Sequence, residues 1–297
     1  MIRIYGFGNA LIDVEITVSD QELASVGIAK GSMAHIGSNQ KNLWIKQFSR
    51  SIASREPGGS IANSIYAASN EDTFCSFSCS LGKDEEGKKF INGFNENNTK
   101  VFSKQSQKPT GTCFIFTTPD GERTMASNLS ANEDLLPECL NIPLLEKSNW
   151  LIFDAFSVCT TNGFKTAKEA LKIAKRNQLK IGFGLADINL VNSNLEEITW
   201  VLNQDIDLLV GNEVEIKLLK KTTKINSDIL CSLGSRGARY NEIQISAHNV
   251  SIVNTNGAGD ALLGVFLSSL DRLGPQESLK SAVNYATEVC LAGGPRI

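Results

Sequence analysis

The sequence contains few of the residues on which common catalytic and metal sites depend. Only two histidines, His35 and His248, occur among its 297 residues, and they lie far apart. This scarcity disfavours a Ser/His/Asp catalytic site and a histidine-based metal site, although one histidine could still take part in a site. The seven cysteines are odd in number and form no Cys-x-x-Cys pair. We therefore expect neither a disulfide framework nor a zinc ribbon, and we interpret the cysteines as small buried residues.

The chain also lacks an excess of positive charge and long apolar runs. Its formal net charge is −3 and like charges form no block, so neither nucleic acid nor an anionic membrane is indicated as a partner. The apolar stretch 261–270 has about half the length of a membrane span. Residues 1–8 lack the basic start, long apolar run and cleavage site of a signal peptide. A cytoplasmic location is the expectation that follows.

Short strands and helices alternate regularly along the second half of the chain. We expect strands at 150–153, 180–184, 207–210, 229–233 and 250–253, and helices at 166–176, 193–202, 213–220, 257–271 and 275–291. Such alternation is typical of a doubly wound, mostly parallel α/β sheet with helices on both faces. Ligands of these sheets bind beyond the carboxyl ends of the strands, where we expect the glycine turns near residues 58, 234 and 257 to meet.

Several short strand candidates in the first half do not fit this alternation. They lie at 14–18, 33–36, 101–103 and 112–118. They indicate a small separate β layer that could cover a site. The length of the chain suits one large α/β domain or two small ones. We expect a single domain over residues 1–297, with a small β lid built from segments 13–37 and 99–127.

The stretch Asn254-Thr255-Asn256-Gly257-Ala258-Gly259-Asp260 is a glycine turn that opens a helix. The first N–H groups of a helix have no internal partner and lie at the positive end of its dipole, and glycines let an anion approach them closely. Asp260 stands beside the position of that anion. An anion cradle next to a carboxylate suits phosphoryl transfer to a hydroxyl, with the carboxylate as proton acceptor. The alternative is ordinary turn and capping chemistry.

Two further turns carry polar residues at helix starts. Asn212 and Glu215 are three apart on one helix face and could hold hydrated Mg²⁺ against a phosphate. The alternative is an N-cap with its capping-box acid. Gly58, Gly59 and Asn63 could bind substrate hydroxyls through backbone and side-chain amides. The alternative there is tight packing of a helix on the sheet.

Asp13 and a second glycine turn are weaker candidates. Asp13 could accept hydrogen bonds from two vicinal hydroxyls, although a lone Asp near a strand end is more often a turn residue. The turn Ser232-Leu233-Gly234-Ser235-Arg236-Gly237-Ala238 either lines a nucleotide or only connects two strands. Gly6-Phe7-Gly8 lacks the third glycine of a dinucleotide motif, and no Gly-x-x-x-x-Gly-Lys-Ser/Thr occurs. If the protein uses ATP, it does so through another cradle.

Together and in order, these motifs resemble those of the ribokinase-like (PfkB) family of carbohydrate and nucleoside kinases. Gly58-Gly59-Ser60-Ile61-Ala62-Asn63 is similar to the family's Gly-Gly-x-x-Ala-Asn, and residues 254–260 to its Asp-Thr-x-Gly-Ala-Gly-Asp. Residues 212–215 match Asn-x-x-Glu, and residues 232–238 resemble Thr-Leu-Gly-x-x-Gly-Ala. Asp120-Gly121-Glu122-Arg123-Thr124 and the terminal Gly294-Pro295-Arg296 are also similar to family sequences. The resemblance runs from Gly6 to the C-terminus.

The resemblance implies a doubly wound α/β fold with a small β lid, and a kinase that uses ATP and Mg²⁺. Asp260 would be the general base, and the amides of Gly257, Ala258 and Gly259 would form the anion hole. Asn212 and Glu215 would place Mg²⁺ and phosphate. The acceptor would bind to Asp13, Gly58, Gly59 and Asn63, and the nucleotide would lie near Asn212, Ser232, Gly234, Gly237 and Asn284.

The sequence departs from the family motifs at two positions. Asn254 replaces an Asp that helps relatives to bind an activating monovalent cation. Because an amide oxygen is a weaker ligand than a carboxylate, activation by such a cation is doubtful here. Ser232 replaces a Thr but keeps the hydroxyl group, so we expect little effect from that change.

The N-terminal part of the chain gives the best indication of the acceptor. Residues 6–13 and Lys30-Gly31-Ser32-Met33 resemble the adenosine-kinase-like branch more than ribokinase or fructokinase. Met33, Cys113 and Phe114 could form an apolar wall for a base, or they could belong to the core of the lid. We expect a nucleoside as acceptor. The alternative is a sugar of the ribose, fructose or 2-keto-3-deoxygluconate type.

Two other classes of function are alternatives to a kinase. A catalytically silent relative that binds nucleotide or sugar is disfavoured by the presence of Asp260, Asn212 and Glu215, and only Asn254 favours it. A partner-binding protein that merely keeps the fold would show a long apolar surface stripe, which the sequence lacks. Homodimers through the lid are common in the family, so such a dimer is a further expectation from the resemblance.

Overall fold

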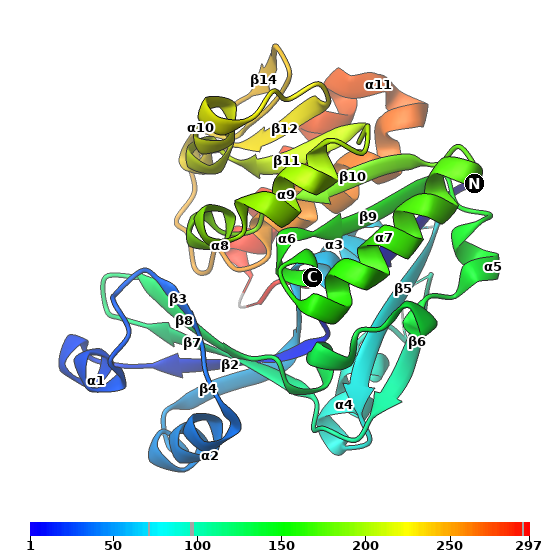
Figure 1. The fold of residues 1–297 in the computed structure, drawn as a ribbon. Helices are drawn as coiled ribbons and strands as arrows, with labels where there is room; N and C mark the ends of the chain where they lie inside the picture. The colour runs from blue at the N-terminus through cyan, green and yellow to red at the C-terminus, as the bar shows by residue number, and fades with distance from the viewer. Residues whose placement is uncertain (71, 96–97, 293) are drawn as a thin grey trace.

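A nine-stranded sheet forms the centre of the large domain in this computed structural model, which describes residues 1–70, 72–95, 98–292 and 294–297 (Figure 1). The strand order is β14-β13-β12-β11-β10-β9-β1-β5-β6. All neighbours from β12 to β6 in this order are parallel, and β13 and β14 add an antiparallel edge. The strands are β1 (Ile2–Phe7), β5 (Thr73–Gly82), β6 (Thr99–Ser106), β9 (Trp150–Asp154), β10 (Lys180–Gly184), β11 (Leu208–Asn212), β12 (Asp228–Ser232), β13 (Ala238–Tyr240) and β14 (Ile243–Ile245).

Helices cover both faces of this sheet (Figure 1). One face packs against α3 (Ser60–Ala68), α4 (Glu85–Asn92) and α11 (Ala258–Leu291). The other face carries α5 (Ile142–Leu145), α6 (Ala155–Val158), α7 (Thr161–Arg176), α8 (Ile188–Ser193), α9 (Leu195–Leu202) and α10 (Glu213–Thr222). Each face buries its own apolar cluster, as expected for parallel strands that are covered on both sides. The doubly wound α/β fold predicted from the sequence is confirmed.

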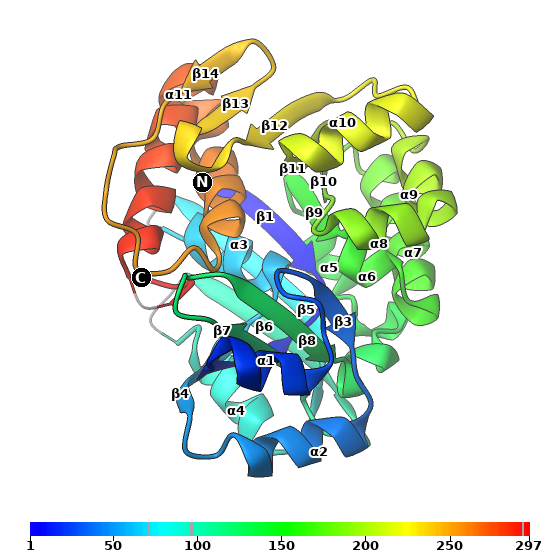
Figure 2. The ribbon, with the colours of Figure 1, turned by 90° about the vertical axis from the view of Figure 1, so that its left-hand side faces the viewer.

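A second, five-stranded sheet forms the lid beside the large domain (Figures 1 and 2). Its strand order is β3-β8-β7-β2-β4. Trp44 and Phe48 pack against Phe116 of this sheet, with Trp44 edge-on at a centroid distance of 5.3 Å. The lid consists of β2 (Leu11–Thr17), β3 (Met33–His35), β4 (Ile52–Gly58), β7 (Gly111–Thr117) and β8 (Arg123–Asn128), with the helices α1 (Asp20–Val26) and α2 (Ser38–Gln47).

The composition of the lid differs from the prediction in two ways. β6, which lies within the segment 99–127 expected in the lid, pairs with β5 at the edge of the large sheet. β4, which the sequence did not indicate as a strand, pairs antiparallel with β2. Alternation of apolar residues predicts a strand but does not say which sheet it joins, because the pairing partner is distant in the sequence.

The strand expected at 250–253 is wrong. These residues adopt no regular secondary structure, and Ile252 and Val253 are exposed to solvent. Their alternation with polar residues therefore does not reflect a buried strand face. The amides of Val253 and Asn254 instead donate to the carbonyl of Cys290 on α11, at 2.9 and 3.1 Å.

Two predicted helices in the second half have irregularities. The helix expected over 193–202 is interrupted at Asn194, whose φ of −134° and ψ of 40° are not helical, and Ser193 ends α8 and does not cap α9. The helices expected at 257–271 and 275–291 are the two parts of α11. They are separated by Gly274, whose φ of 74° and ψ of 170° are not helical either.

The structure bears on two expectations from composition, which concern the cysteines and membrane-spanning helices. All seven cysteines are free, and five of them are buried, so the interpretation as small core residues holds for those five. Over the residues that the structure describes, no helix has both the length and the apolar character of a membrane span.

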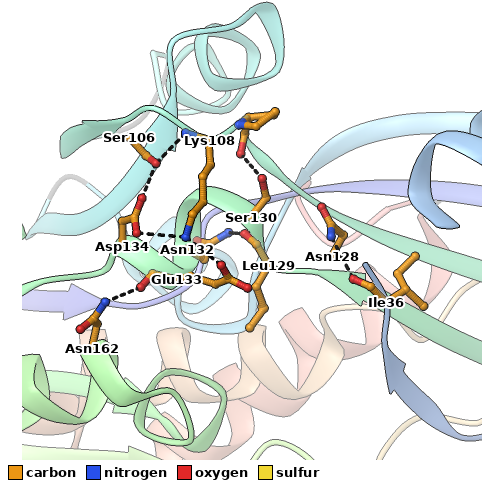
Figure 3. A network of polar contacts seen from close by, with 11 residues as sticks. Ile36, Ser106, Lys108, Asn128, Leu129, Ser130, Asn132, Glu133, Asp134 and Asn162 are labelled. Carbon is orange, nitrogen blue, oxygen red and sulfur yellow. Dashed lines mark hydrogen bonds and ion pairs between the residues drawn. The ribbon is translucent and has the colours of Figure 1, made fainter. Parts of the chain in front are cut away.

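A hydrogen-bond network fixes the junction between the lid and the large domain (Figure 3). The buried Asn132 donates from Nδ2 to the carbonyls of Ala10 (3.0 Å) and Leu129 (2.9 Å), and its Oδ1 accepts from the Ala10 amide (2.7 Å). Ser130 Oγ donates to the carbonyl of Pro109 (2.7 Å). These bonds connect the segments that lead into β2 and β7 with the segment that leaves β8. They position the lid relative to the large domain.

The close crossing of α11 over α3 predicts that a methyl group added at Gly264 destabilises the protein. A Cβ at Gly264 would lie 2.1 Å from the carbonyl oxygen of Ser64 on α3. Gly264→Ala should therefore lower the free energy of unfolding by about 1–3 kcal/mol, although alanine favours a helix more than glycine does. The control is Gly37→Ala, because a Cβ at Gly37 would meet no atom within 4 Å. Urea unfolding measures both, and equal stability of the two variants would contradict the close crossing.

Candidate active site

No side chain caps the N-terminus of α11. Gly257, with a φ of 77°, is the N-cap residue, and no side chain caps the helix. A Cβ at Gly257 would lie 2.3 Å from the Cβ of Pro295, so the turn requires glycine, whereas a Cβ at Gly259 would meet no atom within 4 Å. The Ala258 amide donates to the Thr255 carbonyl over a long 3.3 Å. The start of α11 therefore offers uncapped N–H groups at the positive end of a helix dipole, which is a suitable site for an anion.

Asp260, in the first turn of α11, is held by the first turns of α3. Its Oδ1 accepts a hydrogen bond from Ser60 Oγ (2.7 Å), and its Oδ2 accepts one from Asn63 Nδ2 (3.1 Å). The helix α3 also begins without a side-chain cap, at Gly59, whose φ is 103°. Burial raises the pKa of Asp260, while the two hydrogen bonds and the charge of Arg296 lower it. The carboxyl group is thus fixed in orientation by its neighbours.

Asp13 brings a carboxyl group from the lid to the same region. It is a buried residue of β2, and its Oδ2 accepts a hydrogen bond from Asn256 Nδ2 (3.2 Å). Burial raises the pKa of Asp13 to about 7, against the effects of the Asn256 bond and the Arg296 charge. A Cβ at Gly58 would lie 2.2 Å from the Asp13 carboxyl group, so Gly58 makes room for it. Asp13 lies within a strand, and the alternative interpretation as a turn residue is wrong.

These residues surround a cavity of about 430 Å³ between the lid and the large domain, which we call the first cavity. Most residues that the motifs singled out line it, although they come from distant parts of the chain. They are Asp13, Met33, Gly59, Asn63, Asn212, Glu215, Ser232, Gly257, Gly259 and Asp260. Gly58 does not line it and acts through the space that it leaves for Asp13.

The lid side of the first cavity combines an apolar wall with polar side chains. The wall consists of Leu11, Met33, Cys113, Ile115 and Met125, and the polar lid residues of the lining are Asp13, His35, Arg123 and Ser127. Phe114 lies on the opposite face of the lid sheet, where Trp44 packs against it at a centroid distance of 5.6 Å. Because successive side chains of a strand point to opposite faces, Cys113 and Phe114 cannot both face the cavity. The apolar wall predicted from the sequence is present with Met33 and Cys113, and Phe114 belongs to the lid core.

A second cavity, of about 410 Å³, adjoins the first. Four residues line both cavities: Ser232, Thr255, Gly259 and Leu262. The nucleotide candidates Ser232, Gly234 and Gly237 line the second cavity, and so does Ala258. Asn284 does not, whereas Val283, Ala286, Thr287 and Cys290 of the same helix do. The start of α11 therefore lies where two neighbouring cavities meet.

Asn212 and Glu215 form a capping box at the start of α10, as the capping alternative predicted. Asn212 Oδ1 accepts from the amides of Val214 and Glu215, while the Asn212 amide and Nδ2 donate to the Glu215 carboxylate at 2.8 and 2.7 Å. Both residues also line the first cavity. A carboxylate accepts about four hydrogen bonds, so Glu215 can still bind the water shell of a hydrated Mg²⁺. Among the described residues, no group of three or more His, Cys, Asp and Glu is placed to hold a metal directly.

The first cavity also contains polar residues to which the sequence assigned no role. Asp154, at the end of β9, accepts at Oδ1 from the amide (2.9 Å) and Oγ (2.7 Å) of Ser157, and burial raises its pKa to about 6. Arg123 of β8 donates to the side chains of Asn254 and Thr255. The position of Asp154 directly after the predicted strand 150–153 could have identified it, because ligands bind beyond strand ends. Arg123 lies within the quoted motif 120–124 but had no assigned function.

Comparison with known proteins identifies the family. The description "pfkB family carbohydrate kinase" matches residues 51–297. The chain belongs to this family. It is thereby a phosphotransferase with an alcohol group as acceptor, and the family predicted from the motifs is confirmed.

Curated relatives of this pfkB family member include both sugar and nucleoside kinases. Fructokinase-1 of Oryza sativa subsp. japonica is 24% identical over 270 residues, which cover 78% of this chain and 80% of the relative. Adenosine kinase 2 of Arabidopsis thaliana is 22% identical over 329 residues, which cover 97% of this chain and 93% of the relative. The crystal structure of adenosine kinase from Sinorhizobium meliloti has a TM-score of 0.91 at 22% identity, covering 100% of this chain and 96% of that chain. This likeness shows that the fold is shared.

The raised pKa of Asp13 predicts a pH-dependent stability. The carboxyl group titrates near pH 7 in the native state and near its ordinary value of 3.8 in the unfolded state. Between these values the native state binds more protons than the unfolded state, so the free energy of unfolding falls as pH rises. For this one group, the loss between pH 5 and pH 8 is at most about 2–3 kcal/mol.

Urea unfolding of the ligand-free protein and of the Asp13→Asn variant at pH 5 and pH 8 measures this effect. The variant carries no titrating group at this position, so it should gain stability relative to the wild type at pH 8 and lose most of that advantage at pH 5. A difference between the two proteins that is the same at both pH values would contradict the raised pKa.

Proposed function

We propose that this protein is an ATP-dependent kinase that transfers the γ-phosphoryl group to a hydroxyl group of a nucleoside. The observation that carries the proposal is the position of Asp260. Its carboxyl group lines the first cavity, one helical turn from the uncapped start of α11, where the second cavity begins. The acceptor would occupy the first cavity and ATP the second, so that the reacting groups meet at this helix start.

The chemistry follows from these positions. The acceptor hydroxyl gives its proton to the Asp260 carboxylate while its oxygen forms a bond to the γ-phosphorus, and the bond between that phosphorus and the bridging oxygen of ADP breaks. The N–H groups at Gly257 and Gly259 stabilise the negative charge on the transferred group. Ser60 and Asn63 hold the carboxylate in place through their hydrogen bonds. Asp260 acts as the general base in this scheme.

ATP and Mg²⁺ would be bound by the neighbouring turns. Ser232, Gly234 and Gly237 line the second cavity and are suited to contact the nucleotide. Asn212 and Glu215 line the first cavity and fit the outer shell of a hydrated Mg²⁺. Bound Mg²⁺ neutralises charge on the phosphates. The capping box fixes the two side chains before any ligand arrives.

The apolar lid wall supports a nucleoside over a simple sugar. Met33 and Cys113, with their apolar neighbours, offer a surface that suits a base, while Asp13 and Asn63 offer hydrogen bonds to ribose hydroxyls. Small-molecule sites typically combine an apolar wall with a few polar groups in this way. The presence of an adenosine kinase among the relatives supports this choice. A sugar acceptor is the second candidate, because a fructokinase is also among the relatives.

The test is ATP consumption with Mg²⁺ and a panel of nucleosides, ribose, fructose and 2-keto-3-deoxygluconate. For the acceptor that is turned over, Asp260→Asn should lower kcat by about 10³-fold or more because the base is lost, while the Kd of ATP stays similar. The control is Asp271→Asn, an exposed Asp of the same helix that pairs with Lys180 at 3.0 Å. It should keep the wild-type kcat.

Two outcomes would contradict this function. Unchanged turnover in Asp260→Asn would exclude the proposed base. Tight ATP binding without turnover of any acceptor would favour a catalytically silent relative of the family.

The surroundings of Asn254 predict little dependence on monovalent cations. Its Nδ2 donates to Glu15 Oε1 (2.9 Å), and its Oδ1 accepts from the Asn256 amide (2.7 Å) and from the guanidinium of Arg123. The positively charged guanidinium of Arg123 therefore already contacts the Asn254 side chain. Turnover rates in KCl and in tetramethylammonium chloride at equal ionic strength should agree within about twofold. Strong activation by K⁺ alone would contradict the prediction.

A further inference from the structure

The guanidinium group of Arg296 is enclosed by aromatic rings of the large domain. Its Cζ lies 4.3 Å from the ring centroid of Phe94, 5.3 Å from that of Tyr66 and 5.6 Å from that of Phe90. Tyr66 belongs to α3 and Phe90 to α4, and Phe94 follows α4. A cation is attracted to the face of each aromatic ring. These rings therefore hold the guanidinium group between α4 and α3, the helix that carries Asn63.

Arg296 uses only part of its capacity for hydrogen bonds. Its Nε donates to Asn63 Oδ1 at 3.1 Å, whereas Nη1 and Nη2 are buried and have no hydrogen-bond partner within the described part of the chain. Burial lowers the pKa of Arg296 to about 10, so the group is still charged at neutral pH. A buried cation has a desolvation cost that a methionine between the same rings would avoid. Packing therefore accounts for the position of the side chain but not for its charge.

Asn63 connects Arg296 to Asp260. Its Oδ1 accepts from Arg296 Nε, and its Nδ2 donates to Asp260 Oδ2, each at 3.1 Å. A guanidinium group can only donate and a carboxylate can only accept, so the amide can bridge the two in this orientation alone. Asn63 is 3% exposed, and without Arg296 its Oδ1 would be buried and unsatisfied. The second N–H of Nδ2 remains available to an acceptor hydroxyl.

Arg296 also counters the negative charge of the first cavity. Burial raises the pKa of both Asp13 and Asp260, and the charge of Arg296 lowers both. The pKa of Asp154 is raised by burial and also by the charge of Asp260, so the carboxyl groups lie close enough to repel one another. Arg123 is not among the main causes of the pKa shift of any of these three groups. The positive charge that acts on Asp260 is that of Arg296.

We propose that Arg296 is a positioning residue for the general base. It holds the Asn63 amide in the orientation in which Nδ2 donates to Asp260, and its positive charge stabilises the carboxylate that accepts the proton of the acceptor hydroxyl. Arg296 lines neither cavity, so it acts through Asn63 and through its charge, without touching the ligands. This inference rests on the proposed function, because it takes Asp260 as the base.

The pH dependence of kcat at saturating acceptor tests this role. Arg296→Met removes the charge and the Nε donor but keeps a long side chain that suits the aromatic surroundings. Without the nearby cation, Asp260 should stay protonated to a higher pH, and a protonated carboxyl group cannot act as a base. The kcat of the variant should therefore be about 10-fold below that of the wild type on the acidic limb of the profile, and the difference should shrink as pH rises. The KM of ATP should change little.

Two further variants separate the charge from the packing. Arg296→Lys keeps a cation at this position, so its profile should lie close to that of the wild type. Arg272→Met is the matched control, because Arg272 is an exposed arginine of α11 whose Nε lies 3.8 Å from Asp72 Oδ2. It should leave the profile unchanged. Should Arg296→Met not fold, Arg296→Gln replaces it with the same expected result, since it also removes the charge.

Three results would overturn the role of Arg296. The first is a loss of kcat in Arg296→Met that is equal at every pH, because a purely structural role would have this effect. The second is an equal loss in Arg296→Met and Arg296→Lys. The third is a wild-type profile in Arg296→Met.

Nuclear magnetic resonance of the ligand-free protein tests the same role without turnover. In protein labelled with ¹⁵N-asparagine, the side-chain amide signal of Asn63 should follow the protonation of Asp260, because Nδ2 donates to that carboxyl group. Asn63→Asp identifies the signal by its loss. Asp260→Asn shows which part of the titration comes from Asp260 and which from Asp13 or Asp154. The midpoint of the Asp260 titration should lie at a higher pH in Arg296→Met than in the wild type.

This measurement separates the proposal from the proposed function. Equal midpoints in the wild type and in Arg296→Met would contradict the role of Arg296, even in a protein with full kinase activity. A higher midpoint in Arg296→Met, in a protein that transfers no phosphoryl group to any acceptor, would support the role of Arg296 and contradict the kinase activity.

Discussion

The site depends on the meeting of two helix N-termini that no side chain caps. α3 and α11 begin at Gly59 and Gly257, and the Asp260 carboxyl group of α11 is bound by Ser60 and Asn63 of α3. Other helices of this chain, such as α4 and α10, are capped by their own Asp84 and Asn212. Because no side chain caps these helices, their first N–H groups are available to an anion. The ionisable side chain of Asp260 lies beside them. The rest of the structure arranges the two cavities around this point.

The lid completes the site from the other side. β2 carries Asp13 into the cavity at a place where only glycine, at residue 58, leaves enough space for it. The same sheet presents an apolar wall to the first cavity and packs its other face on α2. The junction around Asn132 ties the lid to the large domain, and Figure 3 shows the bond of this junction between Asn132 and Leu129. One sheet thus supplies both the apolar surface and a buried carboxyl group, which together would select the acceptor.

The sequence predicted the parts of the structure that local patterns determine. Alternating strands and helices indicated the doubly wound sheet, and glycine turns indicated where the site residues meet, as Asn63, Glu215 and Asp260 show. Local patterns did not predict the place of strands that depend on long-range pairing, as in β4 and β6. They also indicated a strand at 250–253, where exposed residues alternate in polarity by chance. The contacts of Arg123 were also out of reach, since its partners Asn254 and Thr255 become neighbours only in the folded chain. Asn212 and Glu215 show a further limit of prediction from sequence, because helix capping and ligand binding require the same residue types at the same spacing.

A crystal structure with adenosine and a non-hydrolysable ATP analogue tests the central claim most directly. The account predicts that an acceptor hydroxyl lies within about 3 Å of the Asp260 carboxyl group. It also predicts that the terminal phosphate of the analogue lies at the amides of residues 257–259, between that hydroxyl and the rest of the nucleotide. A terminal phosphate bound away from the start of α11, or an acceptor whose hydroxyl groups all lie out of reach of Asp260, would contradict it.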